Sequence, residues 1–190
     1  LGDRRIGAAW VGTRRDDKDN GPFQFGGNVL FRELVQHEDG ILGACFPPEM
    51  MPVGREWTEG IISPCLGNVA VDLQTVRLGP GSGLAAATCC GLPHDVRLTM
   101  QVVPQPGAWS FGLFLNADSG LGSGYELSFS PAERCVRLGA QSLMAVSGLD
   151  APFTLEIVLK GDVVDVCIDG RRTVVDRWPE RTGDTVGFFA

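Results

Sequence analysis

The stretch FTLEIVLKGDVVDVCID, residues 153–169, contains two short apolar runs separated by Gly161-Asp162. Every second residue from Phe153 to Leu159 is apolar and the residues between them include Thr154 and Glu156. This period of two is typical of a strand with one buried face. Glycine adopts the positive φ that a tight turn between antiparallel strands requires. The stretch therefore predicts a β-hairpin, and the following Asp169-Gly170 pair predicts a second tight turn.

The same pattern of short runs and turn signals extends from about residue 67 to the C-terminus, and the helical period is nearly absent. The 26 glycines and 12 prolines among 190 residues suit a turn-rich β protein. About ten strands at this spacing predict an all-β fold, an antiparallel two-sheet β-sandwich. The predicted strands span residues 67–78, 84–90, 96–103, 110–117, 124–130, 134–139, 153–160, 163–169, 172–178 and 185–190.

The first 55 residues are organised differently. They contain strand candidates at 5–13, 28–36 and 41–46, the last two joined by a turn at 37–40. Three prolines and little periodicity in 47–60 indicate a linker or an irregular crossover. The expected domains are 1–55, a linker at 56–66, and 67–190. Because a few-stranded unit alone is marginally stable in water, residues 5–46 are expected to pair with strands outside this chain or against the sandwich.

Charge and hydropathy exclude two classes of partner. The net charge of −7 and the pI near 4.8 argue against nucleic acid and anionic membrane surfaces, which select basic proteins. No apolar stretch approaches the roughly 20 residues of a membrane span. The sequence leaves open whether the chain forms a homo-oligomer.

The six cysteines show no Cys-x-x-Cys spacing, and most lie in apolar runs. Buried free thiols are therefore expected, which favours a reducing, cytoplasmic compartment, with secretion open if a segment precedes Leu1. The adjacent Cys89 and Cys90 would point to opposite faces of a strand, a poor start for a metal site. We expect no metal and no cofactor.

No catalytic residue can be assigned from the residues alone. The acidic loop at 16–21 does not match a calcium-binding EF-hand, and nothing brings His37 and His94 together. A glycosidase needs two facing carboxyl groups, and no pair is singled out by its context. Glu33 is expected to have a structural role, in a buried ion pair with a neighbour of Arg32 or with another strand. Two aromatic residues, Trp109 and Tyr125, are candidates for stacking on sugar rings, with the sandwich core as the equal alternative, as for Trp178.

The N-terminal residues resemble the end of the catalytic domain in glycoside hydrolase family 32, the β-fructosidases. That family closes a five-bladed β-propeller with a strand of the type Gly-Arg-Arg-apolar-Gly-Trp-x-Gly and then a Trp-x-Gly…Pro-Arg-Glu-Leu strand. An acidic-glycine turn, a short strand and a Pro-x-Glu-Leu motif follow. The corresponding residues here are 4–12, 25–27, 31–34, 38–40 and 48–50, with Phe25 and Phe31 in place of the family's tryptophan and proline.

The C-terminal residues 163–190 are similar to the end of the concanavalin A-like, jelly-roll type sandwich that follows the propeller in this family. The resemblance implies a C-terminal portion of a family 32-like glycosidase, with fructosides as a candidate substrate class and carbohydrate as the ligand. The family's catalytic motifs, Asn-Asp-Pro, Arg-Asp-Pro and Glu-Cys, do not occur in this sequence. The implied partner is therefore a catalytic propeller portion, on another chain or on an upstream segment.

The resemblance also implies two substrate-binding residues, Trp10 and Phe25. It puts Trp10 in the inner region of the last blade, where the family uses an aromatic residue as a wall of the sugar pocket. The alternative is that Trp10 fills the junction between blade and sandwich. A different class of function stays open as well: a stand-alone concanavalin A-like module for carbohydrate binding or for dimerisation.

Overall fold

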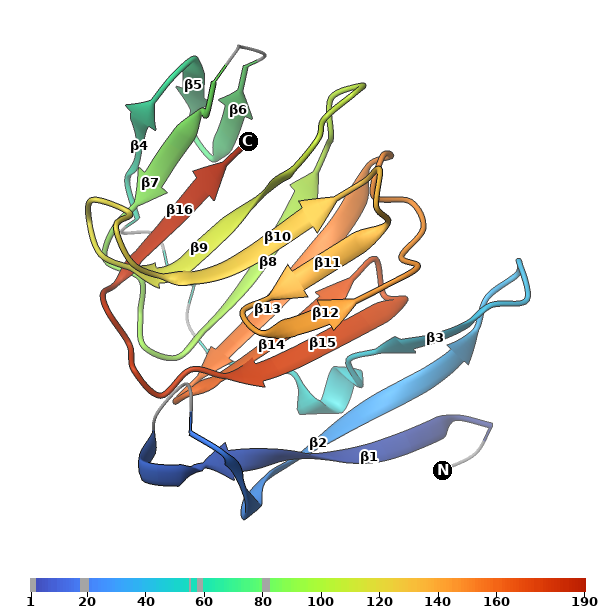
Figure 1. The fold of residues 1–190 in the computed structure, drawn as a ribbon. Helices are drawn as coiled ribbons and strands as arrows, with labels where there is room; N and C mark the ends of the chain where they lie inside the picture. The colour runs from blue at the N-terminus through green and yellow to red at the C-terminus, as the bar shows by residue number, and fades with distance from the viewer. Residues whose placement is uncertain (1–2, 18–20, 55, 58–59, 80–82) are drawn as a thin grey trace. The chain divides into compact units, whose positions relative to one another are not determined.

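The computed structural model describes residues 3–17, 21–54, 56–57, 60–79 and 83–190, and this part of the chain is built almost wholly of antiparallel β-strands (Figure 1). The contacts divide the chain into two compact units. The first unit comprises Leu1–Gly54, Asp95–Val103 and Pro152–Glu180. The second unit comprises Arg55–His94, Pro104–Ala151 and Arg181–Ala190.

An N-terminal sheet of three strands opens the first unit, in the order β1-β2-β3. The strands are β1 (Arg5–Arg14), β2 (Phe23–Gln36) and β3 (Leu42–Cys45). The short 3-10 helices η1 (Arg15–Asp17) and η2 (Pro48–Met50) follow β1 and β3. The three strands predicted here are confirmed, and β2 begins five residues earlier than its pattern indicated.

The second sheet of the first unit has the order β15-β14-β13-β8, from strands β8 (Val96–Val102), β13 (Phe153–Lys160), β14 (Val163–Ile168) and β15 (Arg172–Arg177). The predicted hairpin is confirmed, because Lys160 pairs with Val163 across a turn in which Gly161 has a φ of 58°. The alternation is confirmed too: the apolar residues of β13 from Phe153 to Leu159 are buried at every second position.

The two sheets of the first unit contact one another through hydrogen bonds and ion pairs. Ala44 N donates to Arg171 O at 2.9 Å, and the Arg171 guanidinium pairs with Asp39 at 2.6 Å. Arg32 of β2 forms a buried ion pair with Asp165 of β14. The N-terminal strands therefore pack against the sheet that contains β14 and β15, one of the two arrangements expected from the sequence.

The second unit is organised around a sheet of order β12-β11-β10-β9-β16-β7-β4 (Figure 1). One face is apolar and buried, with Leu115, Leu127 and Val136 at 0% exposure. The strands are β4 (Ile62–Leu66), β7 (Ala86–Cys89), β9 (Phe111–Ala117), β10 (Tyr125–Ser130), β11 (Cys135–Leu138), β12 (Gln141–Leu143) and β16 (Thr185–Phe189).

Residues 67–78 differ from their prediction as one strand. They form a hairpin of β5 (Val69–Asp72) and β6 (Thr75–Leu78). Leu73 takes a φ of 47° in the turn, a conformation that glycine or asparagine usually adopts. Because neither residue is at this position, no signal in the sequence indicates the turn. Strand β4 lies in the segment expected to be a linker, and β12 had no clear signal. The domain boundaries themselves stay a prediction.

The cysteines are free, but three of the six are not buried. Cys89, Cys135 and Cys167 are buried as expected, whereas Cys45 is half-buried and Cys65 and Cys90 are exposed, which corrects the prediction for those three. Burial raises the pKa of Cys167 to about 12. Within the described ranges, no group of three His, Cys, Asp or Glu side chains is arranged to hold a metal ion. No helix in that same part of the chain is long and apolar enough to cross a membrane.

Candidate functional site

An open depression of about 400 Å³ lies on the N-terminal sheet of the first unit. It is lined by Trp10 and Gly12 of β1 and by Phe23 and Gln24 of β2. Two aromatic side chains thus border a hollow next to a glycine. Trp10, one of the residues predicted from the sequence, is among those that line it.

The depression exists because the pairing of β1 and β2 is interrupted beside it. Gly12 lies opposite Gly27, but the next registered pair is Arg14 with Phe23, so β2 bulges. Gly27 has a φ of 127°, and a Cβ there would lie 2.0 Å from Val11 O. The site is therefore shaped by a bulge that only glycine permits at this position.

The indole of Trp10 is fixed in place while over half of it stays accessible. Its Nε1 donates a hydrogen bond to Gly26 O at 2.6 Å, and the side chain is 54% exposed. One hydrogen bond therefore links the predicted tryptophan to the glycine pair of the bulge. An exposed, oriented indole presents a flat apolar surface, which is the element that stacks on the apolar face of a sugar ring.

Phe23 forms the facing border and is itself held from one side by a cation. The Arg14 guanidinium lies 4.3 Å from the centre of the Phe23 ring, a cation–π contact. Arg14 also pairs with Asp176 of β15 at 3.4 Å. The Arg14 side chain therefore links Phe23 to Asp176 in the second sheet of the first unit.

The chemistry of the depression is that of binding. None of the four residues that line it has a side chain that ionises in the ordinary pH range, so the lining itself supplies neither a nucleophile nor a general acid. Its apolar borders and the amide of Gln24 are suited to a ring that has one apolar face and hydroxyl groups at its edge.

Glu33 forms an ion pair with Arg4, but the pair is partly exposed and not buried as the sequence suggested. Arg4 donates to both oxygens of Glu33, at 2.8 and 2.6 Å, and also contacts Glu49. These hydrogen bonds hold the pKa of Glu33 below its ordinary value and lower that of Glu49 to about 2. Both groups are consequently ionised at neutral pH and are unsuited to act as general acids.

The remaining candidates lie elsewhere. Phe25 belongs to β2, but its side chain is outside the described residues. In the second unit, Trp109 is 79% exposed, whereas Tyr125 of β10 is 9% exposed and its ring lies beside Gly139. Trp178 is buried. The structure thus leaves Trp109 accessible and places Tyr125 in the interior, the alternative weighed for it.

Sequence reasoning missed Phe23 and Gln24 as parts of the depression. Both lie between the acidic loop at 16–21 and the strand candidate at 28–36, among residues for which the pattern predicts no element. The available signal was Gly26-Gly27, since consecutive glycines in a strand indicate a bulge.

Comparison with known proteins gives likeness in fold and none in sequence. No protein-family model matches the chain, and no curated protein matches it by sequence. The carbohydrate binding module CBM66 from Bacillus subtilis is 13% identical, with a TM-score of 0.54 over 68% of this chain and 86% of that module. A Bacillus licheniformis β-glucanase is 12% identical, with a TM-score of 0.50 over 70% of this chain and 80% of its own.

A third solved structure spans nearly the whole chain. Sucrose-6-phosphate hydrolase from Lactobacillus gasseri is 12% identical, with a TM-score of 0.54 over 98% of this chain. The matched part is 38% of that enzyme's length. The predicted all-β sandwich is therefore confirmed, and the resemblance to enzymes of this kind is confirmed at the level of the fold.

Proposed function

We propose that this chain is the C-terminal portion of a family 32-like glycoside hydrolase acting on O-glycosidic bonds, with fructosides as its substrate class. The catalytic carboxylates would come from a propeller portion, and β1, β2 and β3 would be strands of its last blade. The observation that carries the proposal is the likeness to sucrose-6-phosphate hydrolase over 98% of the chain, since this share must include the N-terminal sheet.

An exposed apolar face on the N-terminal sheet supports the same proposal. The pairs Trp10–Val29 and Ala8–Phe31 lie on one face of β1 and β2. Trp10, Val29 and Phe31 are 54%, 56% and 37% exposed. Contiguous apolar surface of this kind marks an interaction surface. A blade of a propeller has such a face because it packs against its neighbour.

The test is to purify the protein from its natural source and determine the mass of the polypeptides that carry this sequence. We expect either a longer chain or a second polypeptide of about 300 residues, the usual size of a propeller with its loops. Recovery of a fully active glycosidase whose whole mass is that of these 190 residues contradicts the proposal.

The isolated 190-residue chain is expected to hydrolyse no glycoside. The described residues that line the Trp10 depression include no carboxyl group, and hydrolysis needs two such groups, one on either side of the scissile bond. Release of reducing sugar from sucrose, inulin and levan, and of nitrophenol from aryl glycosides, measures this. Turnover by chain of verified mass and purity refutes the prediction.

Trp10→Ala is expected to impair the assembled enzyme without unfolding it. Because the indole is over half exposed, the free energy of unfolding should fall by only about 1 kcal/mol, against 3–5 kcal/mol for a core tryptophan. The ratio kcat/KM on fructosides should fall about tenfold or more, from the loss of stacking. Leu42→Ala is the matched control, since Leu42 is 55% exposed on the same sheet and does not line the depression. Equal kinetic effects of the two variants would remove Trp10 from the substrate site.

The second candidate function is a stand-alone carbohydrate-binding module. The likeness to CBM66 favours it, because that match takes in 86% of a module of this kind. The two candidates differ in what the N-terminal sheet does. If the chain is a stand-alone module, the 190 residues alone should bind glycans as tightly as the protein purified from its source does. The purified protein should then be monomeric, with no catalytic polypeptide attached.

A further inference from the structure

A second aromatic surface lies in the second unit, on the face of the seven-stranded sheet opposite to its apolar one. Leu113, Leu115 and Leu127 face the apolar side. By the alternation of strands, Gly112 and Phe114 of β9 face the other side, together with Phe189 of β16. We call the pair Phe114 and Phe189 the aromatic platform.

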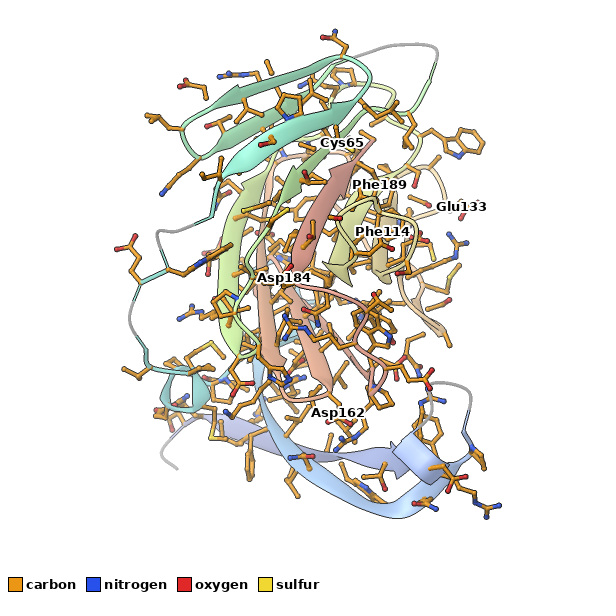
Figure 2. All side chains as sticks on the ribbon, turned by 90° about the vertical axis from the view of Figure 1, so that its left-hand side faces the viewer. Cys65, Phe114, Glu133, Asp162, Asp184 and Phe189 are labelled. Atoms are coloured by element: carbon orange, nitrogen blue, oxygen red, sulfur yellow. The ribbon has the colours of Figure 1, made fainter. Side chains whose placement is uncertain are left out.

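The two rings of the aromatic platform are adjacent and lie on neighbouring strands (Figure 2). Their centres are 5.0 Å apart with an interplanar angle of 39°. The Phe189 ring lies over Gly112, where an added Cβ would be 2.8 Å from the ring. A ring that lies over a glycine in this way is held close to the sheet. Both side chains remain partly exposed, so together they offer an apolar surface to solvent.

A preformed loop borders the aromatic platform on one side. Asp118 Oδ1 accepts hydrogen bonds from Gly120 N at 2.8 Å and Gly122 N at 3.2 Å, and Oδ2 accepts one from Ser123 Oγ at 2.6 Å. These bonds fix the loop and hold the pKa of Asp118 below its ordinary value. At its tip Leu121 packs over Gly187, where a Cβ would lie 2.6 Å from the leucine. The loop therefore has a set shape before any ligand arrives.

Polar groups border the platform on the side of β10 and β11. Glu126 pairs with Phe114 across the sheet and is exposed, so its carboxylate is available to accept hydrogen bonds. Arg137 lies on the next strand, where it pairs with Glu133 at 2.9 Å. The positive charge of Arg137 is therefore already balanced by Glu133. Arg137 consequently gives the platform no preference for an anionic ligand.

We propose that the aromatic platform and Glu126 form a binding site for a neutral carbohydrate, separate from the Trp10 depression. The C–H face of a sugar ring stacks on the two phenyl rings, and its hydroxyl groups donate to the Glu126 carboxylate. Stacking accounts for the apolar surface, and the Glu126 carboxylate accounts for the preference for a hydroxylated ligand over a purely apolar one. The site belongs to the second unit alone and does not depend on a catalytic portion.

The test is titration calorimetry of the 190-residue chain with short oligosaccharides of defined linkage. The probes are inulin- and levan-derived tetrasaccharides, cellotetraose, mixed-linkage β-glucan tetrasaccharide and xylotetraose. We expect at least one to bind, with an affinity that falls tenfold or more in Phe189→Leu and severalfold in Glu126→Gln. Leucine keeps an apolar group over Gly112 and removes only the aromatic face, so the variant should fold; circular dichroism and the Tm verify this.

Trp109→Ala is the matched control, because Trp109 is the most exposed aromatic residue recorded in the same unit. It should leave the affinity unchanged. Binding that is lost in Trp109→Ala and retained in Phe189→Leu assigns the ligand to Trp109 and overturns the proposal. Absence of binding to all five probes overturns it as well. If binding is lost in Trp10→Ala and retained in Phe189→Leu, the ligand binds at the Trp10 depression. That result supports the proposed substrate role of the first unit and refutes the second site, so failure of this inference can be told apart from failure of the proposed function.

Discussion

Replacement of Arg32 by methionine is expected to lower the free energy of unfolding by about 3–5 kcal/mol at pH 8, because it leaves a buried carboxylate without its partner. Arg32 of β2 pairs with Asp165 of β14, and their side chains are 12% and 9% exposed. Methionine keeps the length and apolar stem of the side chain while removing the charge. Urea unfolding at fixed pH measures the change.

The loss is expected to be smaller at pH 5. Burial already raises the pKa of Asp165 to about 6 in the intact protein, in spite of the opposing effect of Arg32. Without Arg32 the pKa rises further, so at pH 5 the carboxyl group is protonated and the buried charge disappears. A loss that is equal at pH 8 and pH 5, or below about 1 kcal/mol at pH 8, would contradict this account.

The matched control is Arg97→Met. Arg97 pairs with Glu156 at 2.6 Å on the same sheet, but the two side chains are 38% and 23% exposed. Since more exposed pairs contribute little, the expected loss is below about 1 kcal/mol. A double variant, Arg32→Met with Asp165→Leu, removes both buried charges and is expected to recover most of the stability.

The intact protein should show the corresponding pH dependence. The pKa of Asp165 in the folded state is above the ordinary value of 3.8, so the folded state binds the proton more tightly than the unfolded state does. This group therefore makes the fold more stable as pH falls through about 6, by roughly 2–3 kcal/mol between pH 8 and pH 4. The carboxylates with lowered pKa, such as Glu33 and Asp39, act in the opposite direction only at lower pH.

The strands could be predicted wherever side-chain alternation and turn residues agreed. Strand β13 matches its prediction at both ends, because Phe153 begins a clean alternation and Gly161 ends it. The hairpin of β5 and β6 could not be predicted, since its turn residue Leu73 is one that seldom adopts a positive φ. The alternation of neighbouring residues indicates the strands, whereas the turn at Leu73 depends on contacts with the rest of the fold.

The candidate site could be predicted only in part. Trp10 was predicted from the resemblance, whereas Phe23 could be identified only from the bulge between β1 and β2, which the structure shows. The pairing of Arg32 with Asp165 joins residues 133 positions apart, and one sequence holds no signal for it. The aromatic platform is a similar case, because Phe114 and Phe189 become neighbours only when β16 pairs with β9. The alternation of side chains along a strand does not tell which strands pair, so contacts that depend on the order of strands in a sheet cannot be predicted from it.

The second large effect is expected for Gly27→Ala, which should lower the free energy of unfolding of the first unit by at least about 3 kcal/mol. Gly27 has a φ of 127°, a conformation that residues with a Cβ rarely adopt. An added Cβ would also lie 2.0 Å from Val11 O, an atom of the main chain that no side-chain rotation can move. Hydrogen exchange of the β1 and β2 amides, with urea unfolding, measures the effect.

The control for this variant is Gly54→Ala in the same unit, since a Cβ there meets nothing within 4 Å. A change within about 0.5 kcal/mol is expected for the control. Gly27→Ala should also open the hydrogen bond from Trp10 Nε1 to Gly26 O, because the bulge that carries this carbonyl cannot keep its form. The indole proton should then exchange faster, and the fluorescence of Trp10 should shift to longer wavelength. If Gly27→Ala is as stable as Gly54→Ala and the indole proton stays protected, the bulge does not need glycine, and the shape of the depression has another cause.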